Sequence, residues 1–251
     1  DLTAPLPTPT TGPSHRVYLP LVQRAPLPPV VITPTEGWGL SASGVWFEEI
    51  EEAELEAMWE RLVEGDCAVA EGNDDEGYIC TVTPDQCCIN PGRHFYTVYV
   101  RRLDLSDYNP MGRIDIGRVA LEFDTSALPG GVRQAALVVT ASHVFTYGPP
   151  VTTSVHLGAW GPVTTTEALR QVWTGWEPEA LVTQVITQNG VYTFTLPVSA
   201  IQVGGTTRLF LRYVADKRLP SPEGGIPYAR LFERWSGPPP PRLIVWLGGG
   251  R

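Results

Sequence analysis

Four cysteines form the group of residues whose spacing most clearly indicates a chemistry. They lie within 22 residues, and the rest of the 251-residue chain has none: Cys67, Cys80, Cys87 and Cys88. A zinc site usually shows two Cys-x-x-Cys pairs, and this cluster has none. Two disulfides that hold together a loop without a core of its own are the better explanation. Such disulfides imply an oxidising, extracellular location.

The pairing of these cysteines stays open between two arrangements. Either Cys67 joins Cys87 and Cys80 joins Cys88, or Cys67 joins Cys88 and Cys80 joins Cys87. A bridge between the neighbours Cys87 and Cys88 would be strained.

Oxygen-bearing side chains between two expected strands form a candidate calcium site. They are Asp104, Asp107, Asn109 and Asp115. Hard oxygen donors suit calcium, but the spacing matches no defined loop such as an EF-hand. Polar turn residues explain the pattern equally well, and we expect no other cofactor.

Trp173 and Trp176 are the candidates for contact with a sugar. They belong to a Trp-Thr-Gly-Trp-Glu stretch that we interpret as a loop. Aromatic faces offer apolar contact to sugar C–H groups. Packing in a core or an interface is the alternative, and it is favoured for Trp235 and Trp246, which alternate within apolar strands.

The sequence offers little for catalysis, and we expect a protein that is not an enzyme. The four histidines are scattered and match no metalloprotease pattern. No Gly-x-Ser-x-Gly elbow is present. Glu122 and Asp124 would share a strand face, as the two carboxylates of a glycosidase could. An exposed or salt-bridged pair is the simpler interpretation, given Arg118 and Arg133 nearby in the sequence.

The distribution of charge argues against two classes of partner. Residues 35–100 carry fifteen acidic groups against two arginines, a net charge of −13, and the whole chain carries −9. An acidic protein without a basic stripe binds nucleic acid poorly. No apolar run approaches the roughly 18 residues that span a membrane. The first residues also lack a signal-peptide pattern, which suggests a processed, mature chain.

Composition divides the chain into three expected parts. Residues 1–34 form a Thr/Pro-rich tail with nine prolines. Residues 35–93 read as an insertion with one acidic helix at 48–64, ended by Gly65 and followed by the cysteine-rich loop. Residues 94–251 read as a β-sandwich.

The third part predicts an all-β, jelly-roll-like fold of two sheets. Apolar or alternating runs separated by Gly, Pro and Asn occur at residues 94–101, 118–123, 134–141, 154–160, 191–196, 207–214, 228–235 and 242–247. Eight short strands with such breaks are typical of a two-sheet sandwich.

This part also resembles the DNRLRE-type β-sandwich domains of bacterial secreted and surface proteins. The residues that carry the resemblance are 99–102 (YVRR), 117–129 (GRVALEFDTSALP), 135–139 (AALVV), 173–177 (WTGWE), 192–195 (YTFT) and 241–245 (PRLIV). The resemblance implies a non-catalytic module, in some cases similar to carbohydrate-binding modules. Val119-Ala120-Leu121-Glu122 stands where an arginine commonly precedes the Phe-Asp pair, so no ligand site is carried over.

A short strand pattern inside the tail leads to the expected function. Its residues are Val17, Tyr18, Leu19, Leu21 and Val22, interrupted by Pro20. One edge of such a strand can add to an exposed sheet edge. We therefore expect a secreted structural subunit of an extracellular bacterial filament or surface layer, a homo-polymer joined by this strand. Docking on the same chain stays open. The alternative is a non-catalytic carbohydrate-binding or adhesin module that binds a polysaccharide.

Overall fold

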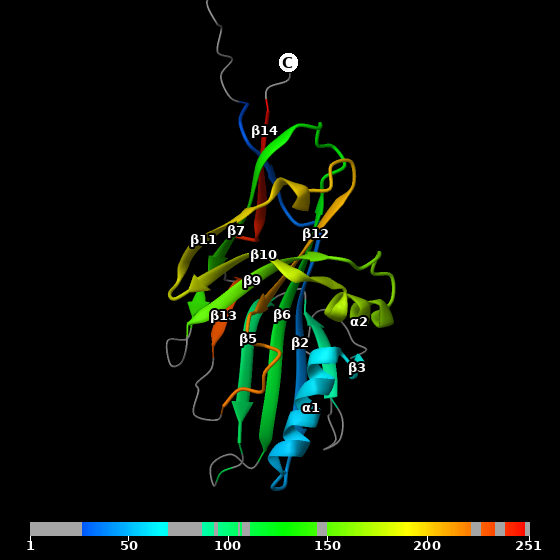
Figure 1. Ribbon diagram of the computed structural model, residues 1–251, viewed down its shortest axis with the longest axis vertical. Coiled ribbons are helices and arrows are strands. Elements are labelled where there is room, and N and C mark those ends of the chain that lie inside the picture. Colours follow the sequence, from blue (N-terminus) through cyan, green and yellow to red (C-terminus); the bar gives the residue numbers. More distant parts are fainter. Residues whose placement is uncertain are drawn as a thin grey trace, which may run out of the picture.

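The computed structural model describes residues 27–69, 87–92, 95–104, 106, 111–144, 150–221, 227–233 and 239–248. The described chain is built mainly of β-strands arranged in two sheets, with two α-helices beside the larger sheet (Figure 1). The predicted tail strand at residues 17–22 lies outside these residues.

The smaller sheet, here called sheet A, has four antiparallel strands in the order β1-β14-β7-β11. Their bounds are Val30–Ile32 (β1), Arg242–Leu247 (β14), Val132–Ala141 (β7) and Gly190–Leu196 (β11). Val30 pairs with Val245, so the end of the predicted tail forms an edge strand beside β14 of its own chain.

The larger sheet, sheet B, follows the order β10-β9-β12-β6-β2-β4-β3, with β5, β13 and β8 branching from it. Its strands are Trp176–Ile186 (β10), Val151–Gly158 (β9), Thr206–Tyr213 (β12), Gly112–Asp124 (β6), Glu36–Trp46 (β2), Cys87–Gly92 (β4), Ala68–Val69 (β3), Phe95–Leu103 (β5), Tyr228–Glu233 (β13) and His143–Val144 (β8). All described pairs are antiparallel except β3 with β4.

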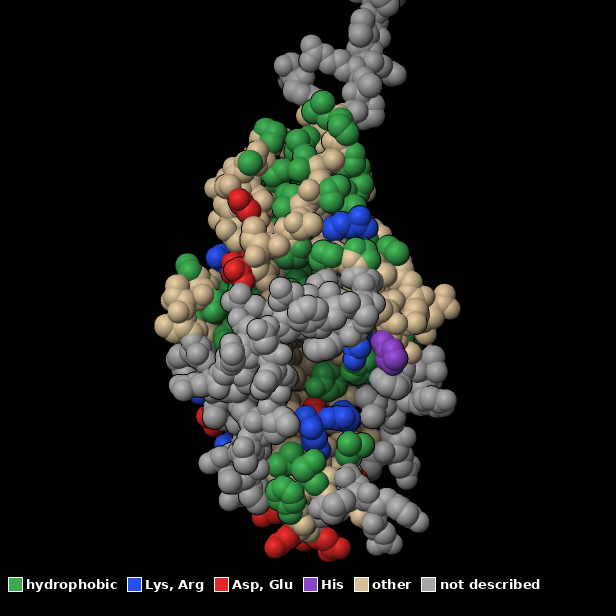
Figure 2. Space-filling view, turned by 180° about the vertical axis from the view of Figure 1, so that it is seen from behind, with side chains coloured by type: hydrophobic (Ala, Val, Ile, Leu, Met, Phe, Trp, Pro, Cys, Tyr) green, Lys and Arg blue, Asp and Glu red, His purple; other side chains and the backbone are tan. Residues whose placement is uncertain are grey.

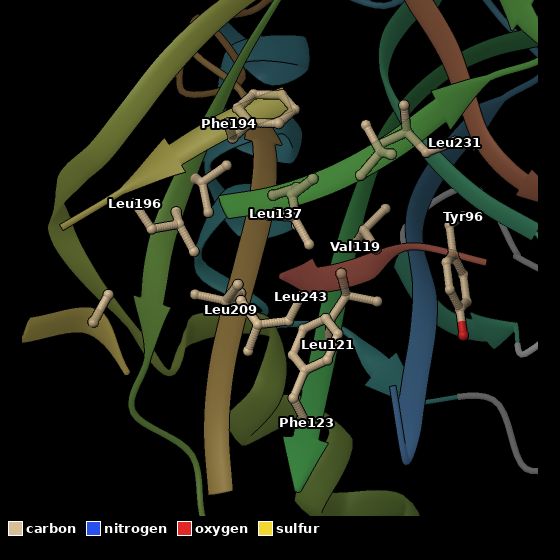
Figure 3. Packing of buried hydrophobic residues seen from close by; sticks show 14 of the residues in the cluster. Tyr96, Val119, Leu121, Phe123, Leu137, Phe194, Leu196, Leu209, Leu231 and Leu243 are labelled. Atoms are coloured by element: carbon tan, nitrogen blue, oxygen red, sulfur yellow. The ribbon is translucent and has the colours of Figure 1, made fainter. Parts of the chain in front are cut away.

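The main hydrophobic core lies between the two sheets. Alternation along β6 directs Val119, Leu121 and Phe123 into it, where each is fully buried. Leu137 of β7 and Leu243 of β14 meet them from sheet A (Figure 3). The sandwich therefore forms because alternate residues of both sheets are apolar and face each other.

A second core lies between sheet B and the helices α1 (Glu52–Glu64) and α2 (Thr166–Thr174). Helix α1 buries Leu55, Met58, Trp59 and Leu62, which lie three or four residues apart. It ends at Gly65, whose φ of 71° is the left-handed conformation that glycine adopts most readily. A short 3₁₀ helix, Val198–Ala200, completes the helical elements of the described chain.

The prediction of a mostly β, sandwich-like protein is confirmed. Each of the eight predicted strands corresponds to a strand of the structure, with ends shifted by a few residues. The predicted helix is present but begins at Glu52 rather than residue 48, after a capping box formed by Glu51 and Glu54.

Strand β2 was not predicted, although it lies inside sheet B and pairs with β6 over its full length. Its sequence is rich in Gly and Ser, which are poor strand formers. Packing explains two of its glycines. A Cβ on Gly37 would lie 2.2 Å from the hydroxyl of Tyr96, and one on Gly44 would lie 2.5 Å from the sulfur of Met58. Residues 36–46, placed in the predicted insertion, thus belong to the same sheet as β6.

The interpretation of residues 173–177 as a loop is wrong. Trp173 lies in α2, whose N-cap Thr165 accepts a hydrogen bond from the backbone of Ala168, and Trp176 begins β10. Pro178 hid this strand in the sequence. It is tolerated because β10 is the outer strand of sheet B.

Candidate functional site

A buried aspartate held by two arginines is the most polar group on the face of sheet B that turns away from the helices. Asp115 of β6 is 0% exposed. Arg101 of β5 approaches its Oδ2 at 2.6 Å through both Nε and Nη2, and Arg113 approaches its Oδ1 at 2.6 Å through Nε. Ser43 of β2 also donates to Oδ1 at 2.5 Å. Three neighbouring strands thus converge on one carboxylate.

The register of the strands explains this convergence. Asp115 is the direct partner of Ser43 on one side and of Arg101 on the other. Directly opposed residues of neighbouring strands point to the same face, and so do residues two apart on one strand. Arg113 therefore joins the same group. We call Ser43, Arg101, Arg113 and Asp115 the open arginine cluster, because the two arginine side chains are 28% and 35% exposed.

Aromatic rings lie beside this cluster. Tyr99, two residues before Arg101, occupies the space above Gly117, where a Cβ would lie 2.1 Å from its ring. The rings of Tyr99 and Tyr228 are 5.6 Å apart, and His143 meets Tyr228 edge-on at 6.4 Å. Burial and the nearby charge of Asp115 raise the pKa of Tyr99, so its hydroxyl stays protonated and neutral. The flat apolar surfaces of Tyr99 and Tyr228 thus lie beside the guanidinium groups of the open arginine cluster.

The surface view from behind agrees with this description. Lys or Arg side chains lie in the middle of this face beside apolar side chains (Figure 2). The helices α1 and α2 lie on the opposite face of sheet B (Figure 1).

A second arginine–aspartate group lies on that opposite, helix-covered face. Arg118 of β6 donates through Nε to Asp216 at 2.8 Å, and Arg212 of β12 pairs with the other oxygen of the same carboxylate. Arg118 also reaches the backbone carbonyls of Val63 and Trp173. We call Arg118, Arg212 and Asp216 the closed arginine cluster. It ties both helices to sheet B and has no exposed arginine: the side chains are 1% and 6% exposed.

Trp173 and Trp176 belong to this closed region and not to a surface platform. Trp173 is 0% exposed, and the Arg118 guanidinium lies 4.1 Å from its ring centre. Trp176 is half-buried and stacks on Phe210 at 5.6 Å. The complete burial of Trp173 contradicts its assignment to a sugar contact. Core packing, the alternative, is what the structure shows for it.

The structure also contradicts the assignment of Asp115 to a calcium site. Both of its oxygens are taken by arginines, which leaves no free charge for a cation. Asp104 accepts a hydrogen bond from Arg102 at 2.8 Å, while Asp107 and Asn109 lie outside the described residues. Within the described part of the chain, no three His, Cys, Asp or Glu side chains are grouped to hold a metal ion.

Ser154 and His156 make a contact of the kind that joins a nucleophile and a base. His156 Nε2 lies 2.9 Å from the Ser154 hydroxyl, and Nδ1 lies 2.9 Å from the carbonyl oxygen of Glu177. Both side chains are only 3% exposed, and burial lowers the pKa of His156. A substrate has no access to such a hydroxyl, so the pair connects β9 to β10 instead.

Glu122 forms a salt bridge, as expected from the sequence. Its partner is Arg208, and not Arg118 or Arg133, which lie near it in the sequence. Glu122 accepts hydrogen bonds from Arg208 at 2.8 Å and from the indole of Trp160 at 2.7 Å. Asp124 is exposed and accepts a bond from the backbone of Ser126 at 2.9 Å. The two carboxylates thus have separate structural partners.

Cys67 is buried beside helix α1, and no described cysteine is free. The backbone register pairs Ala68 with Cys88 and Val69 with Ile89, so residue 67 is level with residue 87. The two proposed pairings remain predictions, since Cys80 lies outside the described residues.

Sheet A has features relevant to assembly. Its two outer strands are β1 and β11. In the described chain, β11 pairs only with β7, so its second edge has no partner strand there. Exposed valines lie on both outer strands: Val31 is 52% exposed and Val191 is 66% exposed. An exposed edge with apolar side chains is a place where another strand can add.

Sequence reasoning missed Ser43, Arg101 and Arg113 as site residues. The available signal was the alternation of polar residues with buried ones, in Tyr99-Val100-Arg101 and in Arg113-Ile114-Asp115. Such alternation marks a strand with one polar face.

Comparison with known proteins assigns no family to this architecture. No protein-family model matches the chain, and a search of curated proteins finds no match. The resemblance to DNRLRE-type domains therefore stays a prediction. No described helix has the length and apolar character needed to cross a membrane.

Proposed function

We propose that this protein is a structural subunit of an extracellular assembly, in which the tail strand of one copy adds to sheet A of the next. The observation that carries this proposal is the position of the two outer strands of sheet A. Residues 1–26 lead into β1 at one edge, and β11 is the unpaired edge on the opposite side. The strand that follows the tail, β1, and the proposed acceptor, β11, are thus the two outer strands of one sheet. Contacts of this head-to-tail kind generate open fibres when the rotation does not close.

The connection between the tail strand and β1 favours docking on a neighbour. Seven residues, 23–29, separate Val22 from Val30, and three of them are prolines. Prolines favour an extended, stiff segment. Docking on the β11 edge of the same chain would need this segment to turn back across about 14 Å of sheet. A stiff connector of this composition therefore favours docking on a neighbouring copy.

Apolar side chains supply the energy for this contact. Burying Val17, Leu19 and Leu21 contributes about 5–8 kcal/mol before the cost of ordering the strand. Val191 at the acceptor edge offers a matching apolar surface. The proposal includes secretion of the chain and disulfides within the cysteine-rich segment, as expected from the spacing of its cysteines.

Removal of residues 1–26 is the direct test, because it leaves β1 in place. We expect the full chain to form oligomers and the shortened chain to be a folded monomer in light scattering. A synthetic peptide of residues 14–24 should bind the shortened chain and slow hydrogen exchange in residues 190–196. The same peptide with Leu19→Asp is the matched control.

Two results would contradict the proposal. One is a shortened chain that still forms oligomers. The other is a monomeric full chain in which residues 17–22 resist proteolysis, since this would place the strand on its own body.

A further inference from the structure

We propose that the open arginine cluster and the tyrosines beside it bind a carboxylate-bearing sugar, such as a uronic acid residue of a glycan. This inference is independent of the tail and of assembly. It concerns a different sheet and a different face of the molecule.

The open arginine cluster is positively charged and has unused hydrogen-bond donors. Two guanidinium groups face a single carboxylate, so Arg101, Arg113 and Asp115 together carry a net charge of +1. Asp115 is saturated by donors on both oxygens. The Nη1 groups of Arg101 and Arg113 have no partner among the described residues, although both side chains are partly exposed. The unused donors are therefore available to an anion from solvent.

The arginines are also held in place before any ligand arrives. Asp115 fixes Arg101 through Nε and Nη2, while Ser43 and Asp115 together fix Arg113. Ordering a free arginine side chain on binding costs conformational entropy. Here the fold has already ordered both side chains. A planar carboxylate matches the forked donors of guanidinium groups, and such charge-assisted bonds are stronger than neutral ones.

The neighbouring rings suggest what the carboxylate is attached to. Tyr99 lies over Gly117, and its ring centre is 5.6 Å from that of Tyr228; both residues are half-buried, so part of this aromatic surface lies beside the cationic groups. Aromatic faces pack against the C–H groups of a sugar ring. A small inorganic anion would use the arginines and leave the rings without a role.

The overall charge limits the ligand further. With a net charge of −9, the protein repels long polyanions such as nucleic acid. A glycan with isolated carboxylates among neutral sugars fits a single local centre of +1 better.

Isothermal titration with chemically matched ligands tests this proposal. The probes are a glucuronic-acid-containing disaccharide, the same disaccharide with a carboxamide in place of the carboxylate, and sodium sulfate. We expect binding of the acid, at least tenfold weaker binding of the amide, and weaker binding of sulfate. Because only the ligand changes, this comparison does not depend on the folding of a variant.

Protein variants then locate the site. Arg113→Gln should weaken binding of the acid at least tenfold, and Arg113→Lys should weaken it less, because lysine keeps the charge but loses the fork. Arg133→Gln, at an exposed position on β7, is the matched control and should bind normally. Circular dichroism confirms that each variant is folded.

The outcomes separate cleanly. Equal binding of acid and amide, or no binding of either, overturns the proposal. Sulfate binding as strong as the acid would indicate an anion site without sugar recognition and would overturn the sugar assignment. Binding should persist in the chain without residues 1–26, so this test stands apart from the test of assembly.

Discussion

Two groups of the same composition, one aspartate between two arginines, lie on opposite faces of strand β6. Asp115 belongs to the open cluster and Arg118 to the closed one, and three residues along a strand separate opposite faces. The two groups differ in the exposure of their arginine side chains to solvent. The arginines of the closed cluster are 1% and 6% exposed, while those of the open cluster are 28% and 35% exposed.

Burial, and not composition, decides whether an arginine–aspartate group joins elements of the fold or presents its guanidinium groups to solvent. In the closed cluster, Arg118 Nη1 donates to backbone carbonyls of both helices and its guanidinium lies over the Trp173 ring, so the group holds the helices in place. Burial lowers the pKa of Arg118, and the charge of Asp216 opposes this effect. In the open cluster, the aspartate is saturated but the arginines reach water. Its guanidinium groups are therefore accessible from solvent.

The largest expected effect breaks the closed cluster. Asp216→Asn leaves two buried guanidinium groups without a counter-charge, which should lower the free energy of unfolding by about 3–5 kcal/mol. Urea unfolding followed by tryptophan fluorescence measures this loss. Adding Arg118→Met should recover part of the loss. A change of less than about 1 kcal/mol for Asp216→Asn would contradict the structural role.

The equivalent change in the open cluster should cost less. Asp115→Asn removes a carboxylate whose arginines can turn to water, so we expect a loss of about 1–3 kcal/mol, measured by the same unfolding experiment. Equal losses for Asp115→Asn and Asp216→Asn would remove the distinction between the two clusters.

Gly117→Ala sharpens the comparison on the open side. The new Cβ would lie 2.1 Å from the Tyr99 ring, so the ring must move, and overpacking of this kind costs about 1–3 kcal/mol. Gly161→Ala is the control, since nothing lies within 4 Å of its Cβ position. Differential scanning calorimetry should show a lower Tm for Gly117→Ala alone. Sugar binding should weaken in this variant as well.

The smallest expected effect is a pH dependence on the closed face. Burial holds the pKa of His156 below its ordinary 6.5, so the folded state favours the neutral ring. As pH falls below about 6.5, the unfolded chain takes up a proton first, and stability decreases. The Tm should therefore fall between pH 7.5 and 5.5. His156→Gln should reduce that fall, and an unchanged pH profile would argue against the neutral, buried ring.

Some of this architecture could be predicted from sequence, and some could not, for definable reasons. The strands with strong apolar alternation were predictable because alternation is a local property. Strand β2 was not predictable, because two of its glycines, Gly37 and Gly44, leave room for Tyr96 and Met58, which belong to other segments of the chain. Trp173 and Trp176 looked like loop residues because Gly175 and Pro178 usually interrupt regular structure.

The residues of the open arginine cluster could not be grouped from the sequence either, because they come from separate segments of the chain. From the sequence, Asp115 was a candidate calcium ligand or a polar turn residue, whereas in the structure two arginines hold it. Ser43 lies 72 residues from it along the chain and Arg101 lies 14 residues away. Only strand register brings the three together.

From the amino-acid sequence alone, the mostly β fold, a helix that ends at Gly65 and the uneven spread of acidic charge could be derived, because these depend on neighbours along the chain. Tertiary structure alone decided that Asp115 is clamped on the open face and that Arg118 is sealed beneath two helices. Arg118 meets Asp216 across 98 residues. A contact over such a distance exists only once the sheet has formed, and burial then determines whether its charges hold the fold together or face solvent.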